Sequence, residues 1–125
     1  MNEYCIDPEI VITLNRSFVE KEFNLLDRGK LEGALAAPLR TFGGELLVPS
    51  PLLQAAMLIE RITNAHAFVD ANKRTAWVCG VTYLELNGFI ITRVEDTDVV
   101  DFMVEIANNA ISIEEIARWL ATRFA

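Results

Sequence analysis

Hydrophobic residues recur along this chain at helical spacing, and start and stop signals separate the resulting segments. We expect six helices, over about residues 8–22, 27–36, 52–64, 71–87, 96–108 and 112–124. Their signals are Asp7-Pro8, Asp27, Ser50-Pro51, Asp96 or Thr97, and a capping box from Ser112 to Glu115. Pro38 is expected to end the second helix, and Gly88 to close the fourth with a left-handed residue.

The hydrophobic faces of these helices predict which of them is buried. One face of the first helix carries Ile10, Val11, Leu14 and Phe18, and the third helix buries Leu53, Met57, Ile59 and Ile62. The fourth helix has apolar residues on more than one face, from Trp77 to Leu86, and is therefore expected to be the buried central helix.

Between Pro38 and Pro49 the pattern changes. Gly43-Gly44 lies between two short flanks in the segment Thr41–Leu46, and paired glycines accept the positive φ angles of a tight hairpin turn. We interpret the segment as a small two-stranded flap, with an irregular loop as the alternative. Residues 89–94 are expected to form a short extended link. The fold class is therefore all-α, a compact bundle of about six helices with a β-hairpin flap, in one domain spanning residues 1–125.

Composition narrows the function classes. The chain is 52% hydrophobic and carries a net charge of −7, which excludes a disordered tail and argues against direct nucleic acid binding. Eight acidic residues and one basic residue, Arg93, occur from Glu85 to Glu115. This stretch is either a solvated face or a docking surface for a basic partner.

No apolar stretch is long enough to span a membrane, and the first seven residues lack the pattern of a signal peptide. A cytoplasmic protein is expected. Cys5 and Cys79 have no metal-type spacing, and Cys79 lies in an apolar run, so we expect a buried thiol and no disulfide.

The candidate chemistry lies in the segment His66–Thr75, which contains the only histidine of the chain. His66 is a candidate general base, because an imidazole exchanges a proton near neutral pH. Asp70 is either an N-cap of the following helix or a ligand for Mg²⁺, in which case Asn72 caps the helix. Phe68 is expected to anchor the loop in the core, and Trp77 to be a packing residue.

Lys73-Arg74 is the only pair of adjacent basic residues, and it falls in the first turn of the fourth helix. Cations there oppose the helix dipole, so the pair contradicts the local preference unless an anion binds. Bound phosphate would interact favourably with the cations and with the free N–H groups of the helix start. The alternative is a basic pair that faces solvent without a ligand.

This segment resembles the signature of the Fic/Doc family, in its Doc branch. The wider Fic pattern is His-x-Phe-x-Asp/Glu-Gly-Asn-Gly-Arg-x-x-Arg, and the chain matches it at His66, Phe68, Asp70, Asn72 and Arg74. It departs from the pattern at three positions: Ala71 and Lys73 replace glycines, and Trp77 replaces the second arginine.

The resemblance implies an enzyme. Fic enzymes generally transfer AMP to a protein hydroxyl, whereas Doc proteins that share the lysine are kinases that transfer the γ-phosphoryl group of ATP to a threonine of elongation factor Tu and so stop translation. By this resemblance His66 is catalytic, Asp70 holds Mg²⁺, and Asn72, Lys73 and Arg74 bind phosphate, with Lys73 excluding the pose for AMP transfer.

Two alternatives stay open, AMP transfer and a non-catalytic module that binds a nucleotide or a partner. The inhibitory helix motif of many Fic proteins has its nearest match at Thr41–Glu45, where the glycine pair disfavours a helix. Inhibition is therefore expected from another chain, by resemblance a Phd-type antitoxin, for which a groove among the N-terminal helices is a reasonable site.

Overall fold

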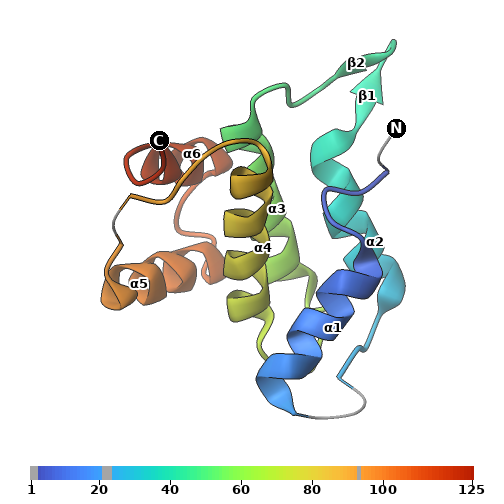
Figure 1. Ribbon diagram of the computed structural model, residues 1–125. Helices are drawn as coiled ribbons and strands as arrows, with labels where there is room; N and C mark the ends of the chain where they lie inside the picture. Colours follow the sequence, from blue (N-terminus) through green and yellow to red (C-terminus); the bar gives the residue numbers. More distant parts are fainter. Residues whose placement is uncertain (1–2, 21–23, 93) are drawn as a thin grey trace.

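The computed structural model describes residues 3–20, 24–92 and 94–125. Figure 1 shows α-helices packed side by side, with a hairpin that projects at one end. The elements are α1 (Pro8–Val19), α2 (Arg28–Ala36), the short 3₁₀ helix η1 (Ala37–Leu39), β1 (Thr41–Phe42), β2 (Glu45–Leu46), α3 (Pro51–Ala65), α4 (Asn72–Leu86), α5 (Asp96–Ala107) and α6 (Ile113–Ala121). The all-α prediction and the antiparallel flap are confirmed. No helix in the described part of the chain is both long and apolar enough to cross a membrane.

Four of the predicted helix starts are confirmed by capping hydrogen bonds. The N–H of Glu9 donates to Asp7 at 2.8 Å, and the N–H of Lys30 donates to Asp27 at 3.0 Å. Ser50 accepts from the N–H of Leu53, and Ser112 and Glu115 form the reciprocal capping box. The start of α5 was misplaced by one residue, because its N-cap is Glu95 rather than Asp96 or Thr97.

Two helices end earlier than the sequence indicates. Glu20 adopts a left-handed conformation with φ 52° and ends α1 at Val19; residues 21 and 22 of the predicted helix lie outside the described residues. Helix α6 stops at Ala121, because the residues beyond it pair with the extended link. Phe124 forms an antiparallel bridge with Ile91, and the N–H of Thr92 donates to the carbonyl of Arg123 at 2.8 Å.

Helix α3 is the centre of the bundle. It packs against α2, α4, α5 and α6, and its residues Leu58 and Ile59 are completely buried. The prediction that α4 is the buried central helix is wrong: α3 takes that place, and Leu86 near the C-terminal end of α4 is 73% exposed. Ile10 of α1, assigned from periodicity to the buried face, is 61% exposed, because α1 is buried only along the stripe that carries Val11.

Three aromatic rings connect α4 to the two C-terminal helices. The ring of Trp77 meets Phe102 of α5 and Trp119 of α6 edge-on, with centroid distances of 6.3 and 6.0 Å. Phe102 and Trp119 stack at 3.8 Å, and the guanidinium of Arg123 lies over the Trp119 ring. Edge-to-face and stacked pairs are both favourable for aromatic rings. Trp77 is therefore a packing residue, as predicted.

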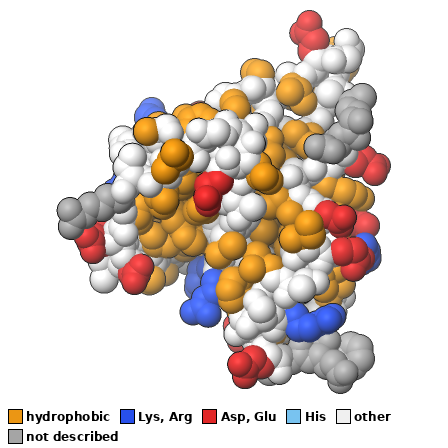
Figure 2. Space-filling model, viewed as in Figure 1, with side chains coloured by type: hydrophobic (Ala, Val, Ile, Leu, Met, Phe, Trp, Pro, Cys, Tyr) orange, Lys and Arg blue, Asp and Glu red, His pale blue; other side chains and the backbone are white. Residues whose placement is uncertain are grey.

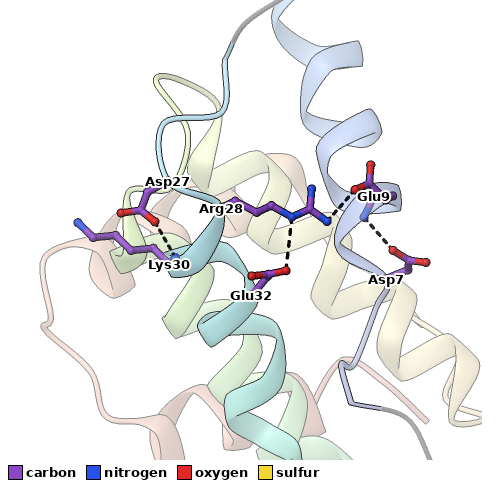
Figure 3. A network of polar contacts seen from close by, with 6 residues as sticks. All are labelled: Asp7, Glu9, Asp27, Arg28, Lys30 and Glu32. Carbon is purple, nitrogen blue, oxygen red and sulfur yellow. Dashed lines mark hydrogen bonds and ion pairs between the residues drawn. The ribbon is translucent and has the colours of Figure 1, made fainter.

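Polar contacts at the surface join the starts of α1 and α2 (Figure 3). The Arg28 guanidinium in the first turn of α2 donates to Glu9 of α1 at 2.7 Å and to Glu32 at 3.4 Å. Both ion pairs are exposed to solvent and therefore contribute little to stability. Arg28 directly follows Asp27, the N-cap of α2, so these ion pairs lie at the start of that helix.

The two cysteines are both free. Cys79 is 1% exposed in α4, as predicted, and Cys5 is partly buried. Burial raises the pKa of each thiol to about 12, so both remain protonated at neutral pH. Since the thiolate is the reactive form, neither cysteine is a candidate nucleophile.

Gly80 allows α3 and α4 to approach closely. A Cβ atom placed on Gly80 would lie 2.4 Å from Cγ1 and Cδ1 of Ile59, well inside van der Waals contact. Ile59 is completely buried and has little room to move. The glycine is therefore required by packing rather than by backbone conformation.

Gly80→Ala is expected to destabilise the protein by about 1–2 kcal/mol, because overpacking of about 1–3 kcal/mol exceeds the helix propensity gained. Adding Ile59→Val removes Cδ1, one of the two atoms that clash, and should recover part of the loss. Gly33→Ala in α2 is the control, because its Cβ would meet nothing within 4 Å and should stabilise the helix. Urea unfolding measures all three, and a Gly80→Ala protein as stable as Gly33→Ala would contradict this account.

Candidate active site

The predicted functional segment forms the connection between α3 and α4. His66 ends α3 in the left-handed region, with φ 51° and ψ 41°. Ala71, directly before α4, is also left-handed, with φ 62°. Figure 1 places this loop at the lower end of the bundle, where α1 also ends. We refer to residues 66–71 as the motif loop.

The segment that precedes α2 holds the motif loop in place. The N–H of Leu26 donates to the carbonyl of Ala67 at 2.7 Å, and the N–H of Val69 donates to the carbonyl of Asn24 at 2.8 Å. Between them, Phe68 forms an antiparallel bridge with Leu25 and inserts its ring into the core, where it is 2% exposed. Phe68 therefore anchors the loop, as predicted.

The structure brings all five predicted site residues together in the motif loop and the first turn of α4. The side chains of His66, Asp70, Lys73 and Arg74 are exposed. In Figure 2, Lys and Arg side chains are visible at the lower end of the molecule, below a surface on which hydrophobic side chains gather. The loop therefore presents one imidazole, one carboxylate and two cations to solvent.

Asn72 faces the motif loop. Its Nδ2 donates to the carbonyl of Phe68 at 2.9 Å, and its Oδ1 accepts from the N–H of Phe68 at 3.3 Å. Both ends of the amide are thus occupied by the backbone of one residue. Asn72 does not cap α4, and neither does Asp70, whose Oδ1 accepts from the N–H of Ala71 at 2.7 Å.

The start of α4 differs from the other helix starts. Among the α-helices in the described part of the chain, α4 alone has neither a capping side chain nor an acidic residue in its first turn. It carries Lys73 and Arg74 there instead. The first N–H groups of a helix have no partner within the helix, so this positive helix end and both cations are available to an anion.

The site contains residues that the sequence did not identify. Arg74 lies over the ring of Phe18 in α1, at 5.3 Å from the centroid, which is a cation–π distance. Beneath the loop, Asn15 and Asn24 bind the carbonyl of Asp70. A signal existed for Asn15, because it follows Val11 at helical spacing and is therefore a polar residue on the buried stripe of α1.

The flap lies away from the motif loop. In Figure 1, β1 and β2 precede the upper end of α3, whereas the loop follows its lower end. Since α3 has 15 residues, about 22 Å of helix separates them. The flap and the motif loop therefore lie at opposite ends of α3.

The donor set around Asp70 fits a metal ion that arrives with its ligand. One oxygen of the exposed Asp70 carboxylate binds the Ala71 N–H, which leaves the other for a cation. Within the described residues there is no group of three or more His, Cys, Asp or Glu side chains that could hold a metal alone. Mg²⁺ is commonly held by one or two carboxylates together with substrate phosphates and water.

Comparison with known proteins agrees with this geometry. The sequence model of the family described as Fic/DOC family matches residues 5–84, which include the motif loop and most of α4. The chain belongs to the Fic/DOC family. It is also 36% identical over 122 residues to a protein named Toxin Doc from Mycolicibacterium smegmatis, which covers 97% of this chain and 93% of that protein.

At position 71, where this chain departs from the Fic/DOC family pattern, the backbone conformation explains why the pattern has a glycine. The pattern has a glycine there, and Ala71 has the left-handed conformation that glycine adopts without strain. An alanine in this conformation costs roughly 1–2 kcal/mol. The motif loop therefore stores strain that the surrounding contacts must offset.

Ala71→Gly is expected to leave stability unchanged or to raise it by up to about 1 kcal/mol, because relief of strain competes with the greater freedom of the unfolded chain. Ala71→Val should lower stability by more than about 1 kcal/mol, since β-branched residues avoid positive φ. Ala121→Gly, at the exposed end of α6, is the control and should be mildly destabilising. Thermal unfolding compares the three; equal losses for glycine at 71 and 121 would contradict the strain at Ala71.

Proposed function

We propose that this chain is a Doc-like toxin, a protein kinase that transfers the γ-phosphoryl group of ATP to a protein hydroxyl. The observation that carries the proposal is the start of α4, which has no cap, bears Lys73 and Arg74, and is joined by the short motif loop to the exposed His66. Phosphoryl transfer requires positioning and charge neutralisation more than covalent chemistry from the protein. The exposed groups of the loop are suited to those tasks.

Each residue has a role in this mechanism. His66 accepts the proton of the target hydroxyl as that oxygen attacks the γ-phosphorus, and the bond from phosphorus to the bridging oxygen of ADP breaks. Arg74 and Lys73 bind the phosphate oxygens together with the first N–H groups of α4. Arg74 is held on Phe18 in this structure and would turn from that ring toward phosphate.

Asp70 would hold Mg²⁺, which supplies neutralisation of the phosphate charge when it is bound with ATP. Asn72 contributes indirectly. Because both ends of its amide bind the backbone of Phe68, it shapes the turn from which Asp70 and the N–H groups project. This role supplements the phosphate contact expected from the family pattern.

The structure around positions 73 and 77 favours phosphoryl transfer over AMP transfer. The exposed Lys73 places bulk and charge where the wider Fic pattern has a glycine that would allow close approach of phosphates. Trp77 replaces the second arginine of that pattern, and its ring meets both Phe102 and Trp119 edge-on. Two elements of the AMP-transferring loop are thus replaced.

The target and the inhibitor follow from the Doc resemblance. We propose a threonine hydroxyl of elongation factor Tu as the acceptor, in the cytoplasm, with arrest of translation as the consequence. The segment Thr41–Glu45, nearest to the inhibitory motif of other Fic proteins, lies in the β-hairpin and its turn. This supports inhibition by a separate Phd-type antitoxin.

Incubation of the protein with ATP, Mg²⁺ and elongation factor Tu is expected to add a phosphoryl group to the factor, detected by intact mass. His66→Asn should reduce the rate by about 100-fold or more, because the general base is lost. Asparagine is the suitable replacement, since it tolerates the left-handed backbone of His66.

The control is Asn109→His, the reverse exchange at a left-handed residue after α5, which should keep full activity. An adenylyl increment in place of a phosphoryl increment would assign the chain to AMP transfer. Absence of either increment, combined with measurable ATP binding, would favour a non-catalytic binding module.

Lys73→Gly is expected to reduce phosphoryl transfer by about tenfold, because it removes a cation from the phosphate site. It should also allow AMP transfer, since the glycine clears space for the nucleotide in the orientation that AMP transfer requires. Lys30→Gly is the matched control, an exposed lysine in the first turn of α2. Product masses for both variants decide the matter, and full kinase activity in Lys73→Gly would remove the proposed role of this lysine.

A further inference from the structure

A buried network of side chains lies directly beneath the motif loop. Asn15 of α1 is completely buried, and its Nδ2 donates to the carbonyl of Asp70 and to the hydroxyl of Thr75, each at 3.0 Å. Asn24 is 5% exposed, and its Nδ2 donates to the same carbonyl at 3.2 Å and to Oδ1 of Asn15. We call Asn15, Asn24 and Thr75 the amide clamp.

The donors of the amide clamp converge on one backbone oxygen. Each side-chain amide has two N–H bonds, and all of those on Asn15 and Asn24 are used within the network. The carbonyl of Asp70 accepts one from each. Buried polar side chains are costly unless they are paired, so two buried asparagines that meet on a single carbonyl require an explanation.

The clamp determines how the peptide between Asp70 and Ala71 is oriented. A trans peptide is planar, and its C=O and N–H point in opposite directions. With the carbonyl held toward the interior, the N–H of Ala71 points away from the clamp, where it donates to the Asp70 carboxylate at 2.7 Å. The clamp therefore also sets the position of the exposed carboxylate.

The same contacts act on the strained residue. Ala71 follows the clamped carbonyl and has φ 62°, which an alanine adopts only when its surroundings hold it there. Thr75, the other acceptor of Asn15, lies in the first turns of α4, and its N–H donates to the carbonyl of Ala71 at 3.0 Å. The clamp thus binds the chain on both sides of Ala71.

We propose that Asn15 and Asn24 are positioning residues for the transfer reaction, which hold the Asp70–Ala71 peptide so that the Asp70 carboxylate and the start of α4 face the nucleotide phosphates. They act through Asp70 and Ala71 and do not touch the substrate. This inference rests on the proposed phosphoryl transfer for its kinetic consequence, but the loop geometry that it describes is testable without any activity.

The principal variants are Asn24→Ala and Asn24→Asp. Alanine removes both hydrogen bonds, and aspartate keeps the shape while it replaces the donor by an acceptor. Among the described residues Oδ1 of Asn24 has no hydrogen-bond partner, so these variants break few other contacts. Gln54→Ala is the matched control, because Gln54 is a buried amide at the other end of α3, bound to Tyr83 and to the carbonyl of Val48.

Both Asn24 variants are expected to lower kcat for phosphoryl transfer by about 10- to 100-fold, the effect of a small misplacement of reacting groups. The kcat of Gln54→Ala should remain within about twofold of the wild-type value, even if its melting temperature falls as much as that of the Asn24 variants. Adding Ala71→Gly to Asn24→Ala should recover kcat by about fivefold relative to Asn24→Ala alone, because glycine holds the left-handed conformation without support.

Amide hydrogen exchange of the nucleotide-free protein gives the independent readout. Exchange at Val69 and Thr75 should quicken by about tenfold in the Asn24 variants and not in Gln54→Ala. The proposal would be overturned if both amides of the Asn24 variants exchanged at the wild-type rate. It would also be overturned if kcat simply followed the melting temperature across all variants. If the wild-type protein transfers no phosphoryl group, the proposed function fails, and the exchange result alone decides whether the clamp positions the loop.

Discussion

The close packing of α3 against α4 is the constraint on which the rest of the structure depends. The motif loop is the connection between these two antiparallel helices, so their spacing sets the distance between His66 at the end of α3 and Lys73 at the start of α4. Gly80 permits the approach, and Ile59 fills the space that a side chain would occupy. Because protein interiors are close-packed, the helix pair provides a rigid base for the loop.

A rigid base alone does not specify the loop. Its two left-handed residues, His66 and Ala71, flank a stretch of backbone that is held by contacts from outside the helix pair. The segment before α2 supplies backbone hydrogen bonds at Ala67 and Val69, and Phe68 inserts into the core. Side chains that face solvent can therefore project from a backbone that several hydrogen bonds hold in place, which is the arrangement expected of a preorganised site.

The two cations at the start of α4 lie where the local preference of a helix disfavours them. Lys73 and Arg74 occupy the one described α-helix start that has neither a capping side chain nor an acidic residue in its first turn. Local electrostatics disfavours them there, and a bound polyanion would reverse the balance. The proposed phosphate site would resolve this conflict. Trp77 departs from the family pattern, and its ring is accommodated by edge-on contacts with Phe102 of α5 and Trp119 of α6.

The sequence by itself determined the helices, most of their caps, the flap and the residues of the motif loop, because these depend on interactions within a few residues. Asp7, Asp27, Ser50 and Ser112 cap the helices that they precede, and Phe68 and Trp77 pack as their apolar rings require. Only the tertiary structure decided that α3 is central, that Ile10 and Leu86 face solvent, and that Asn72 binds the loop backbone. These features depend on which helix faces meet. Asn15 and Asn24 meet on the carbonyl of Asp70 although it lies 55 and 46 residues away along the chain, a separation that local patterns do not encode.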